Sequence, residues 1–175
     1  LNSLNAIGLQ NITLSVNLSP LQFGQADLVE RTLAIIQKHQ VATSQIELEI
    51  TESVFLNDGP QTHEMFAALK GLGVRLSLDD FGTGYSSLGY LKSAPFDKIK
   101  IDQSFVRGAT EPGSRNKAII TAIVVLARAL DMETTAEGIE SMDQLAMIRE
   151  LEVSHVQGYV YSKPVDNAAF LEHVS

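Results

Sequence analysis

Short apolar runs with strand character alternate along the chain with longer segments of helical period. This alternation is typical of βα units and predicts a parallel sheet covered by helices. The expected strands are 12–17, 46–51, 75–79, 98–101, 134–136 and 155–158. The expected helices are 28–40, 60–72, 115–130, 142–150 and 167–174. A closed barrel usually needs eight strands, so we expect either an open barrel or one that is completed by chain outside this sequence.

Polar, mostly acidic motifs stand at the ends of the expected strands. They are Asn17-Leu18-Ser19, Glu49-Ile50-Thr51-Glu52, Asp79-Asp80-Phe81-Gly82-Thr83-Gly84, Lys100-Ile101-Asp102, Glu137-Gly138-Ile139-Glu140 and Gln157-Gly158-Tyr159. Right-handed crossovers return every parallel strand to the same end, so these residues should meet at one rim. Their oxygen donors suit Mg²⁺ or Mn²⁺ rather than zinc, and such ions most often serve phosphate chemistry. The pattern therefore predicts a hard-metal site at this rim.

Composition narrows the classes of function. The 175 residues favour one domain, and the absence of cysteine excludes a disulfide framework and makes a cytoplasmic setting the default. A net charge of −8 argues against binding a nucleic-acid polymer. The longest apolar run, 118–127, is far shorter than the ~20 residues of a spanning helix, so we expect no membrane contact from this segment. The chain starts at Leu1 without a targeting leader, and its start looks cut, which leaves room for a parent protein anchored through upstream segments.

The motifs at 79–88, 49–52, 100–105, 137–140 and 157–159 together closely resemble the EAL family of bacterial cyclic-di-GMP phosphodiesterases. The resemblance keeps the family's order and extends over essentially the whole chain. It implies an α/β fold, namely an incomplete TIM-like (β/α)₈ barrel with six parallel strands, so that residues 1–175 form a partial EAL domain. The family's first two strands and its Glu-Ala-Leu motif, whose glutamate is a metal ligand, would lie upstream of Leu1.

The implied activity is hydrolysis of one phosphodiester bond of cyclic-di-GMP, which gives linear pGpG by in-line attack of water. Two divalent cations, Mg²⁺ or Mn²⁺, would lie about 4 Å apart and activate that water. The resemblance also implies a homodimer and an upstream sensory or GGDEF-type domain in the parent protein. Two alternatives stay open: a catalytically inactive cyclic-di-GMP receptor or scaffold, and a fragment with neither binding nor turnover.

Residue by residue, the resemblance implies the following roles. The metal ligands would be Asn17, Glu49, Asp79, Asp80 and Glu137. The catalytic residues would be Asp79, Lys100 and Glu137, with Glu137 a ligand first and a general base second. The substrate contacts would be Gln22, Lys100, Asp102, Glu140, Gln157 and Tyr159. Glu52 would anchor the loop 80–88, whose glycines allow it to move.

Plainer interpretations exist for several of these residues. Taken alone, Asp79 and Asp80 fit a strand end that enters an Asx-type turn equally well. Glu140 also fits an acidic residue at a helix N-terminus, where the helix dipole favours it. Asp102 would hold Lys100 or a water in place, whereas Lys98 is expected to be an ordinary solvated lysine.

Overall fold

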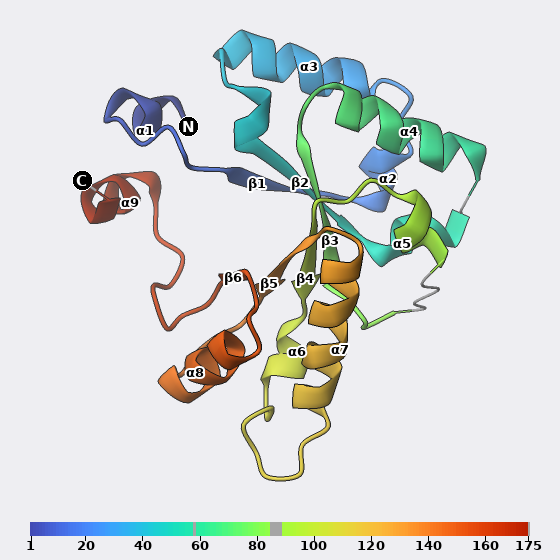
Figure 1. Ribbon diagram of the computed structural model, residues 1–175. Helices are drawn as coiled ribbons and strands as arrows, with labels where there is room; N and C mark the ends of the chain where they lie inside the picture. The colour runs from blue at the N-terminus through green and yellow to red at the C-terminus, as the bar shows by residue number, and fades with distance from the viewer. Residues whose placement is uncertain (58, 85–88, 175) are drawn as a thin grey trace.

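The computed structural model describes residues 1–57, 59–84 and 89–174 (Figure 1). The strands are β1 Leu14–Leu18, β2 Ile46–Thr51, β3 Arg75–Phe81, β4 Lys98–Ile101, β5 Glu133–Ala136 and β6 His155–Val156. The α-helices are α1 Asn2–Ala6, α2 Pro20–Phe23, α3 Leu28–His39, α4 Pro60–Gly71, α5 Gly89–Ser93, α6 Gln103–Val106, α7 Asn116–Ala129, α8 Met142–Glu150 and α9 Asn167–Val174. Two 3₁₀-helices, η1 Thr43–Gln45 and η2 Glu52–Asn57, flank β2.

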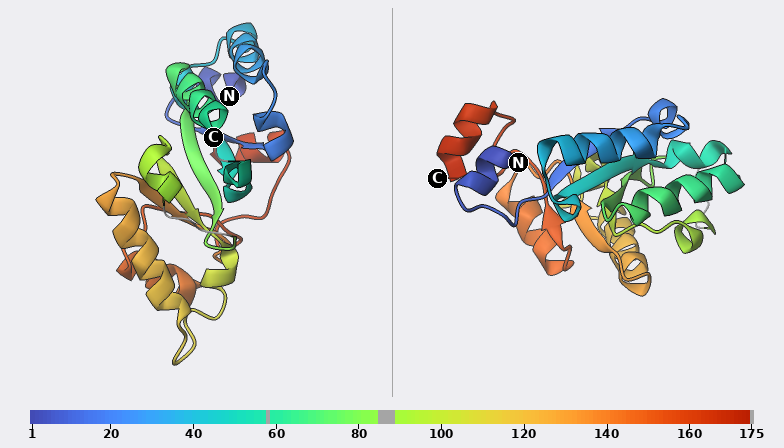
Figure 2. Two further views of the ribbon diagram at one scale, coloured as in Figure 1. Left: turned by 90° about the vertical axis from the view of Figure 1, so that its right-hand side faces the viewer. Right: turned by 90° about the horizontal axis from the view of Figure 1, so that it is seen from above.

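The six strands form one parallel sheet in chain order, from β1 at one edge to β6 at the other. The sheet curves into an open half-barrel with its helices outside (Figures 1 and 2). Helices α3 and α4 contact each other, and α7 packs on β4 and β5. Helices α1 and α9 lie side by side, so the two chain ends are close (Figure 2). The predicted incomplete barrel of six parallel strands is confirmed.

Alternation along the strands decides which side chains face the helices. Leu78 and Ile99 are fully buried on the outer face of the sheet, where Phe66 of α4 and Ile120 of α7 are fully buried as well. Each such side chain stabilises the fold by about 1.5–3 kcal/mol relative to an exposed one. The residues between them point to the opposite face, because successive strand residues alternate. The inner face of the half-barrel is therefore polar.

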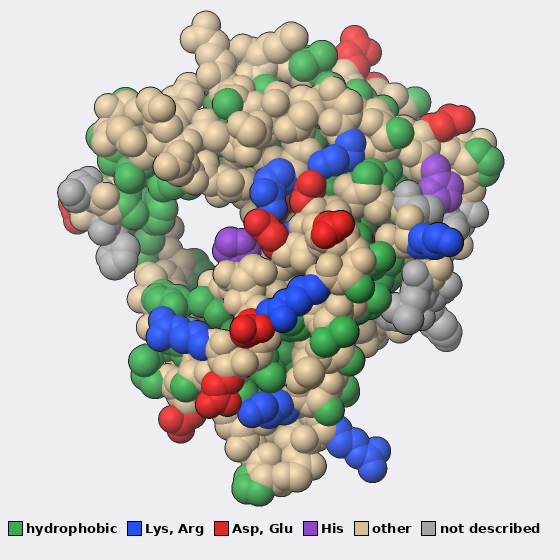
Figure 3. Space-filling model, viewed as in Figure 1, with side chains coloured by type: hydrophobic (Ala, Val, Ile, Leu, Met, Phe, Trp, Pro, Cys, Tyr) green, Lys and Arg blue, Asp and Glu red, His purple; other side chains and the backbone are tan. Residues whose placement is uncertain are grey.

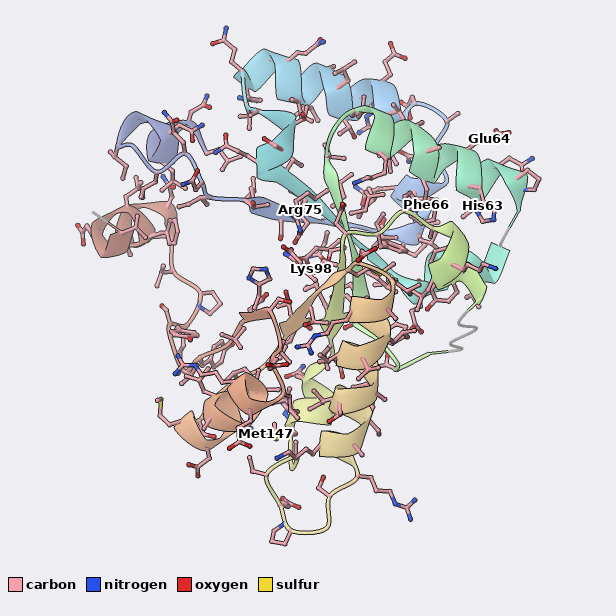
Figure 4. All side chains as sticks on the ribbon, in the orientation of Figure 1. His63, Glu64, Phe66, Arg75, Lys98 and Met147 are labelled. Atoms are coloured by element: carbon pink, nitrogen blue, oxygen red, sulfur yellow. The ribbon has the colours of Figure 1, made fainter. Side chains whose placement is uncertain are left out.

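One consequence of this alternation is an ionic network inside the half-barrel, at the strand ends opposite the predicted rim. The Lys98 ammonium donates to Glu47 Oε1 at 2.9 Å and lies 2.8 Å from Glu47 Oε2, and Arg75 Nε lies 3.5 Å from the same Oε2. Arg75 also pairs with Glu133. Figure 4 shows Arg75 and Lys98 side by side, and Figure 3 shows acidic and basic side chains intermixed beside a hollow on the same face. The expectation that Lys98 is a solvated lysine is wrong: its side chain is 14% exposed, because it shares a strand face with Lys100.

We expect Lys98→Met to lower the free energy of unfolding by about 2–4 kcal/mol, because it removes the nearer of the two cations that face the buried Glu47 carboxylate and leaves Arg75, whose Nε lies 3.5 Å away. Urea unfolding of the full-length protein measures this loss. Lys117→Met is the matched control, since Lys117 pairs with Glu150 at 3.4 Å while both side chains are about half exposed or more. That substitution should cost at most about 0.5 kcal/mol. Equal losses in the two variants would contradict a structural role for the network.

Among the residues that the structure describes, none of the helices has the length and apolar character needed to cross a membrane. The predicted apolar run 118–127 lies within α7, which has 14 residues. Its buried side chains pack into the core instead.

Candidate functional site

Lys100 lies at the centre of a carboxylate cluster inside the rim of the half-barrel. Its Nζ is 2.7 Å from Glu49, 2.8 Å from Asp79 and 2.7 Å from Glu137. These residues come from β2, β3, β4 and the end of β5, so four chain segments build the cluster. Burial acts to lower the pKa of Lys100, but the three carboxylates outweigh burial and raise the pKa well above its ordinary value. The ammonium therefore stays charged at any physiological pH.

The end of β3 brings two successive aspartates to the same place. Strand alternation would turn Asp79 and Asp80 to opposite faces. The backbone of Asp80 instead adopts a left-handed conformation, with φ of 54°, and the pairing of β3 with β4 shifts register at this point. The Asp80 amide donates to Asp79 Oδ1 at 3.1 Å, and the Thr83 hydroxyl donates to the Asp80 carbonyl at 2.8 Å. Both carboxylates thus face the cluster.

The resulting set of oxygens fits a hard divalent cation. Asp79, Asp80 and Glu137 each offer a carboxylate oxygen, and these oxygens all lie within 4.8 Å of one another. With Glu49 the cluster has four carboxylates and the ammonium of Lys100, so it carries an excess of negative charge; Glu49 and Asp79 are buried, whereas Asp80 is exposed. Oxygen-only donors of this kind suit Mg²⁺, Mn²⁺ or Ca²⁺ rather than softer metals.

Two of these carboxyl groups are harder to ionise than usual. Burial raises the pKa of Glu137, and the negative charges of Asp79 and Glu49 add to this effect while Lys100 opposes it. Burial also raises the pKa of Asp80, with further contributions from Asp79 and Asp102. A divalent cation would relieve this repulsion, because it adds the positive charge that the cluster lacks.

The other predicted metal ligand and two predicted substrate contacts lie elsewhere along the rim. Asn17 is paired in register with Glu49, at the exposed end of β1. Gln22 forms a capping box, in which its Oε1 accepts from the amide and hydroxyl of Ser19 at 3.1 and 2.9 Å. Asp102 caps α6 by accepting from the Ser104 amide at 2.9 Å. Within the described residues, Asp102 forms no ion pair with Lys100, so the proposed contact between them is not seen.

Glu137 connects the carboxylate cluster to a pocket of about 600 Å³. Three predicted substrate contacts, Glu140, Gln157 and Tyr159, line this pocket together with Glu137. Its volume is within the range of sites for small organic ligands. Lys163, from the motif Ser162-Lys163-Pro164 that follows 157–159, lines it as well, and its ammonium lies 5.8 Å from the centre of the Tyr159 ring. Arg107 also lines the pocket, and the sequence did not single it out.

Backbone contacts hold the two halves of this pocket together. The Ile139 amide donates to the Gln157 carbonyl at 3.1 Å, and the Gln157 amide donates to Ala136 at 2.9 Å. Gly158 approaches so closely that a Cβ there would lie 2.2 Å from the Ile139 carbonyl oxygen. The glycine in the motif 157–159 is therefore required by close packing, and this packing places Gln157 beside the segment that carries Glu137.

Glu52, the predicted loop anchor, contacts the loop that follows Asp80. Its Oε1 accepts from the Gly82 amide at 3.1 Å, and its Oε2 would be 2.9 Å from a Cβ added at Gly84. Residues 85–88 of the predicted mobile loop lie outside the described part of the chain. The same Glu52 oxygen accepts from the Tyr90 hydroxyl at 3.0 Å, a contact that no sequence pattern indicated.

The raised pKa values predict a pH dependence of cation binding. Both carboxyls must lose their protons to bind a cation, so Mn²⁺ affinity should weaken as the pH falls, and the loss should begin at a higher pH than it would for ordinary carboxyls. Without metal the sign is opposite: acids with a raised folded-state pKa hold their protons better in the fold, so they stabilise it as pH falls. Thermal unfolding with and without Mn²⁺ as a function of pH measures both trends. In the absence of metal, Asp80→Asn should make the unfolding temperature less dependent on pH. An Mn²⁺ affinity that does not change with pH would contradict the assignment of these carboxyls as cation ligands.

Comparison with known proteins gives a consistent result. The family model described as the EAL domain matches residues 1–164. The chain is 39% identical over 173 residues to the cyclic di-GMP phosphodiesterase NbdA of Pseudomonas aeruginosa, covering 98% of this chain and 22% of NbdA. The chain therefore spans about a fifth of the length of that relative.

Solved structures share the fold. The EAL enzyme Bd1971, in its form bound to cAMP and cyclic-di-GMP, superposes with a TM-score of 0.92 at 35% identity, over 99% of this chain and 47% of that one. BlrP1 of Klebsiella pneumoniae, in a complex with manganese and cyclic di-GMP, gives a TM-score of 0.82 at 28% identity, over 92% of this chain and 41% of BlrP1.

Proposed function

Because the chain belongs to the EAL domain family, we propose that it is the catalytic part of a metal-dependent phosphodiesterase that hydrolyses cyclic-di-GMP to linear pGpG. The observation that carries this proposal is the convergence of Glu49, Asp79, Asp80, Glu137 and Lys100 at one rim, next to a pocket. The names of NbdA and of the cyclic-di-GMP complexes support the choice of substrate.

The chemistry assigned to the cluster follows from its charges. Divalent cations held by Asp79, Asp80 and Glu137, with Glu49 and Asn17 as further ligands, would acidify the attacking water and offset charge on the phosphate. Mg²⁺ or Mn²⁺, and two ions rather than one, are the arrangement we propose. Lys100 keeps its proton and so stabilises negative charge that grows on the phosphate oxygens.

Proton and bond changes balance with the groups at hand. The water oxygen bonds to phosphorus, the bond from phosphorus to the 3′-oxygen breaks, and that oxygen takes up a proton from solvent. Glu137 is primarily a ligand, and its raised pKa also suits it to accept the proton that the water loses. The product keeps a 5′-phosphate and gains a free 3′-hydroxyl.

The pocket beside the cluster fits the rest of this substrate. Cyclic-di-GMP has two guanines and two negatively charged phosphates. The Glu140 carboxylate and the Gln157 amide can hydrogen-bond the edge of a guanine, and the ring of Tyr159, which is 55% exposed, can stack on it. Arg107 and Lys163 offer positive charge for a phosphate. Gln22 and Asp102 would complete the contacts from the other side of the rim, although both side chains already serve as helix caps.

We propose that residues 1–175 are part of one EAL domain, that the protein forms a homodimer, and that a sensory or GGDEF-type domain regulates it. We also propose that this domain lies in the cytoplasm, the default setting for a chain without cysteine. Size measurement by light scattering of the full-length protein tests the dimer.

The direct test is incubation of the full-length protein with cyclic-di-GMP and Mn²⁺ or Mg²⁺, with products separated by chromatography. We expect pGpG to appear with either metal and to vanish when a chelator is added. Binding of cyclic-di-GMP without turnover would replace the proposal by the receptor alternative. Neither binding nor turnover would overturn both.

A further inference from the structure

Glu52 contacts both the turn that follows Asp80 and the side chain of Tyr90, which belongs to α5. Its Oε1 accepts from the Gly82 amide at 3.1 Å and from the Tyr90 hydroxyl at 3.0 Å. A glutamate side chain has several rotatable bonds, and fixing them costs entropy that one backbone contact repays poorly. The hydroxyl of Tyr90 supplies a second fixed point for the same oxygen.

Tyr90 is itself tightly fixed. Its side chain is 5% exposed, and its ring stacks on Phe55 with centroids 4.0 Å apart and an angle of 11° between the planes. Phe55 stacks in turn on Phe66 of α4, which is labelled in Figure 4, with centroids 5.3 Å apart. Phe23 and Phe96 pack against the same ring of Phe66. The phenol therefore points at Glu52 from a rigid base of aromatic side chains.

The hydroxyl acts as a donor in this contact. Burial raises the pKa of Tyr90 well above that of an exposed tyrosine, and the Glu52 carboxylate raises it further. The phenol stays protonated, so it gives a hydrogen bond to a charged acceptor, which is stronger than one between neutral groups.

The position of Glu52 bears on the candidate metal site because Gly82 follows Asp80 closely. Asp80 needs its left-handed backbone to face the cluster, and the next residues form the turn that holds this conformation. Glu52 binds the amide of that turn at Gly82 and lies against Gly84. A Glu52 free to rotate would leave the turn, and with it Asp80, less well fixed.

We propose that Tyr90 is a positioning residue, which holds Glu52 against the turn at Gly82 and thereby keeps Asp80 in place at the cation site. The expected effect of Tyr90 on kcat rests on the proposed function, whereas its expected effect on the order of the turn at residues 80–84 does not. Tyr90 is not one of the carboxylates of the cluster, and it is not among the described residues that line the pocket, so its hydrogen bond to Glu52 is the route that we propose for its effect.

The test is a double-substitution cycle in the full-length protein with Tyr90→Phe and Glu52→Ala. Tyr90→Phe keeps the ring stack and removes only the hydroxyl. We expect it to lower kcat for cyclic-di-GMP about tenfold, the effect of one hydrogen bond to a charged group. In the Glu52→Ala background the same substitution should change kcat less than about twofold. Tyr161→Phe, which removes a hydroxyl from a side chain that is 58% exposed, is the matched control and should change nothing.

Amide hydrogen exchange gives a readout that does not need activity. Peptides covering residues 80–84 should exchange about tenfold faster in Tyr90→Phe, with β2 and β4 unchanged. Equal exchange in variant and wild type would overturn the inference, as would faster exchange over the whole sheet, which marks a merely structural role. Additive effects on kcat in the cycle would also overturn it. Absence of hydrolysis by the wild type would instead refute the proposed function, and the exchange data would then decide on Tyr90 alone.

Discussion

Asp79→Asn should abolish divalent-cation binding at the carboxylate cluster and lower kcat for cyclic-di-GMP by about 10³-fold or more. Asp79 is 8% exposed and contacts Lys100, and its oxygens lie close to those of Asp80 and Glu137. Asparagine keeps the shape but removes the negative charge and replaces one carboxylate oxygen by an NH₂ group, so the cluster loses a charged ligand. Substitution of a residue that only supports a metal ligand typically lowers metal affinity or activity by roughly 10- to 100-fold, so substitution of a ligand itself should have a larger effect. Calorimetric titration with Mn²⁺ and steady-state kinetics measure the two effects.

Asp97→Asn is the matched control for this experiment. Asp97 precedes β4 and pairs with Lys70 at 2.8 Å, and it also accepts from the Leu76 amide at 2.7 Å, away from the cluster. Its substitution should lower stability by about 1–3 kcal/mol and leave cation affinity unchanged. Loss of Mn²⁺ binding in Asp97→Asn, or its retention in Asp79→Asn, would contradict the assignment of the site.

Lys100→Met should separate catalysis from cation binding. The ammonium and a divalent cation compete for the same oxygens of Asp79 and Glu137, so its removal should leave Mn²⁺ affinity equal or tighter. Removing a charge that stabilises the transition state should still lower kcat about 10²- to 10³-fold. The carboxylates then repel one another without a buried cation, so the rise in unfolding temperature on adding Mn²⁺ should exceed that of the wild type.

Lys98→Met is the matched comparison, because Lys98 lies on the same strand and the same face two residues earlier. It pairs with Glu47 rather than with the cluster. We expect it to reduce stability while kcat, measured where the protein is folded, stays within about twofold of the wild type. Weaker Mn²⁺ binding in Lys100→Met would show instead that the lysine organises the ligands.

Much of this architecture could be predicted from the sequence. Strands such as 46–51 and 98–101 are bounded by clear motifs, and the rule that parallel strands end at one rim brings Glu49, Asp79, Lys100 and Glu137 together. The pocket shared by Glu137, Glu140, Gln157 and Tyr159 follows from the same rule. These features depend on periodicity and chain order, both of which can be read from one sequence.

Other features depend on local conformation that periodicity does not encode. The left-handed backbone of Asp80 breaks strand alternation, so the sequence could not show that both aspartates face the cluster. Lys98 could have been placed inside, since it shares the alternation of Lys100. No sequence pattern indicated the contact of Tyr90 with Glu52, because an aromatic residue near the start of a helix resembles any core residue. Predicted ligand roles for Asn17 and Gln22 stay predictions.

The most direct measurement is anomalous scattering from crystals of the full-length protein grown with Mn²⁺. The account predicts a manganese peak with oxygens of Asp79, Asp80 and Glu137 about 2.0–2.3 Å away, lost in crystals of Asp79→Asn. A protein that hydrolyses cyclic-di-GMP while its manganese binds at a different place, or nowhere, would contradict it.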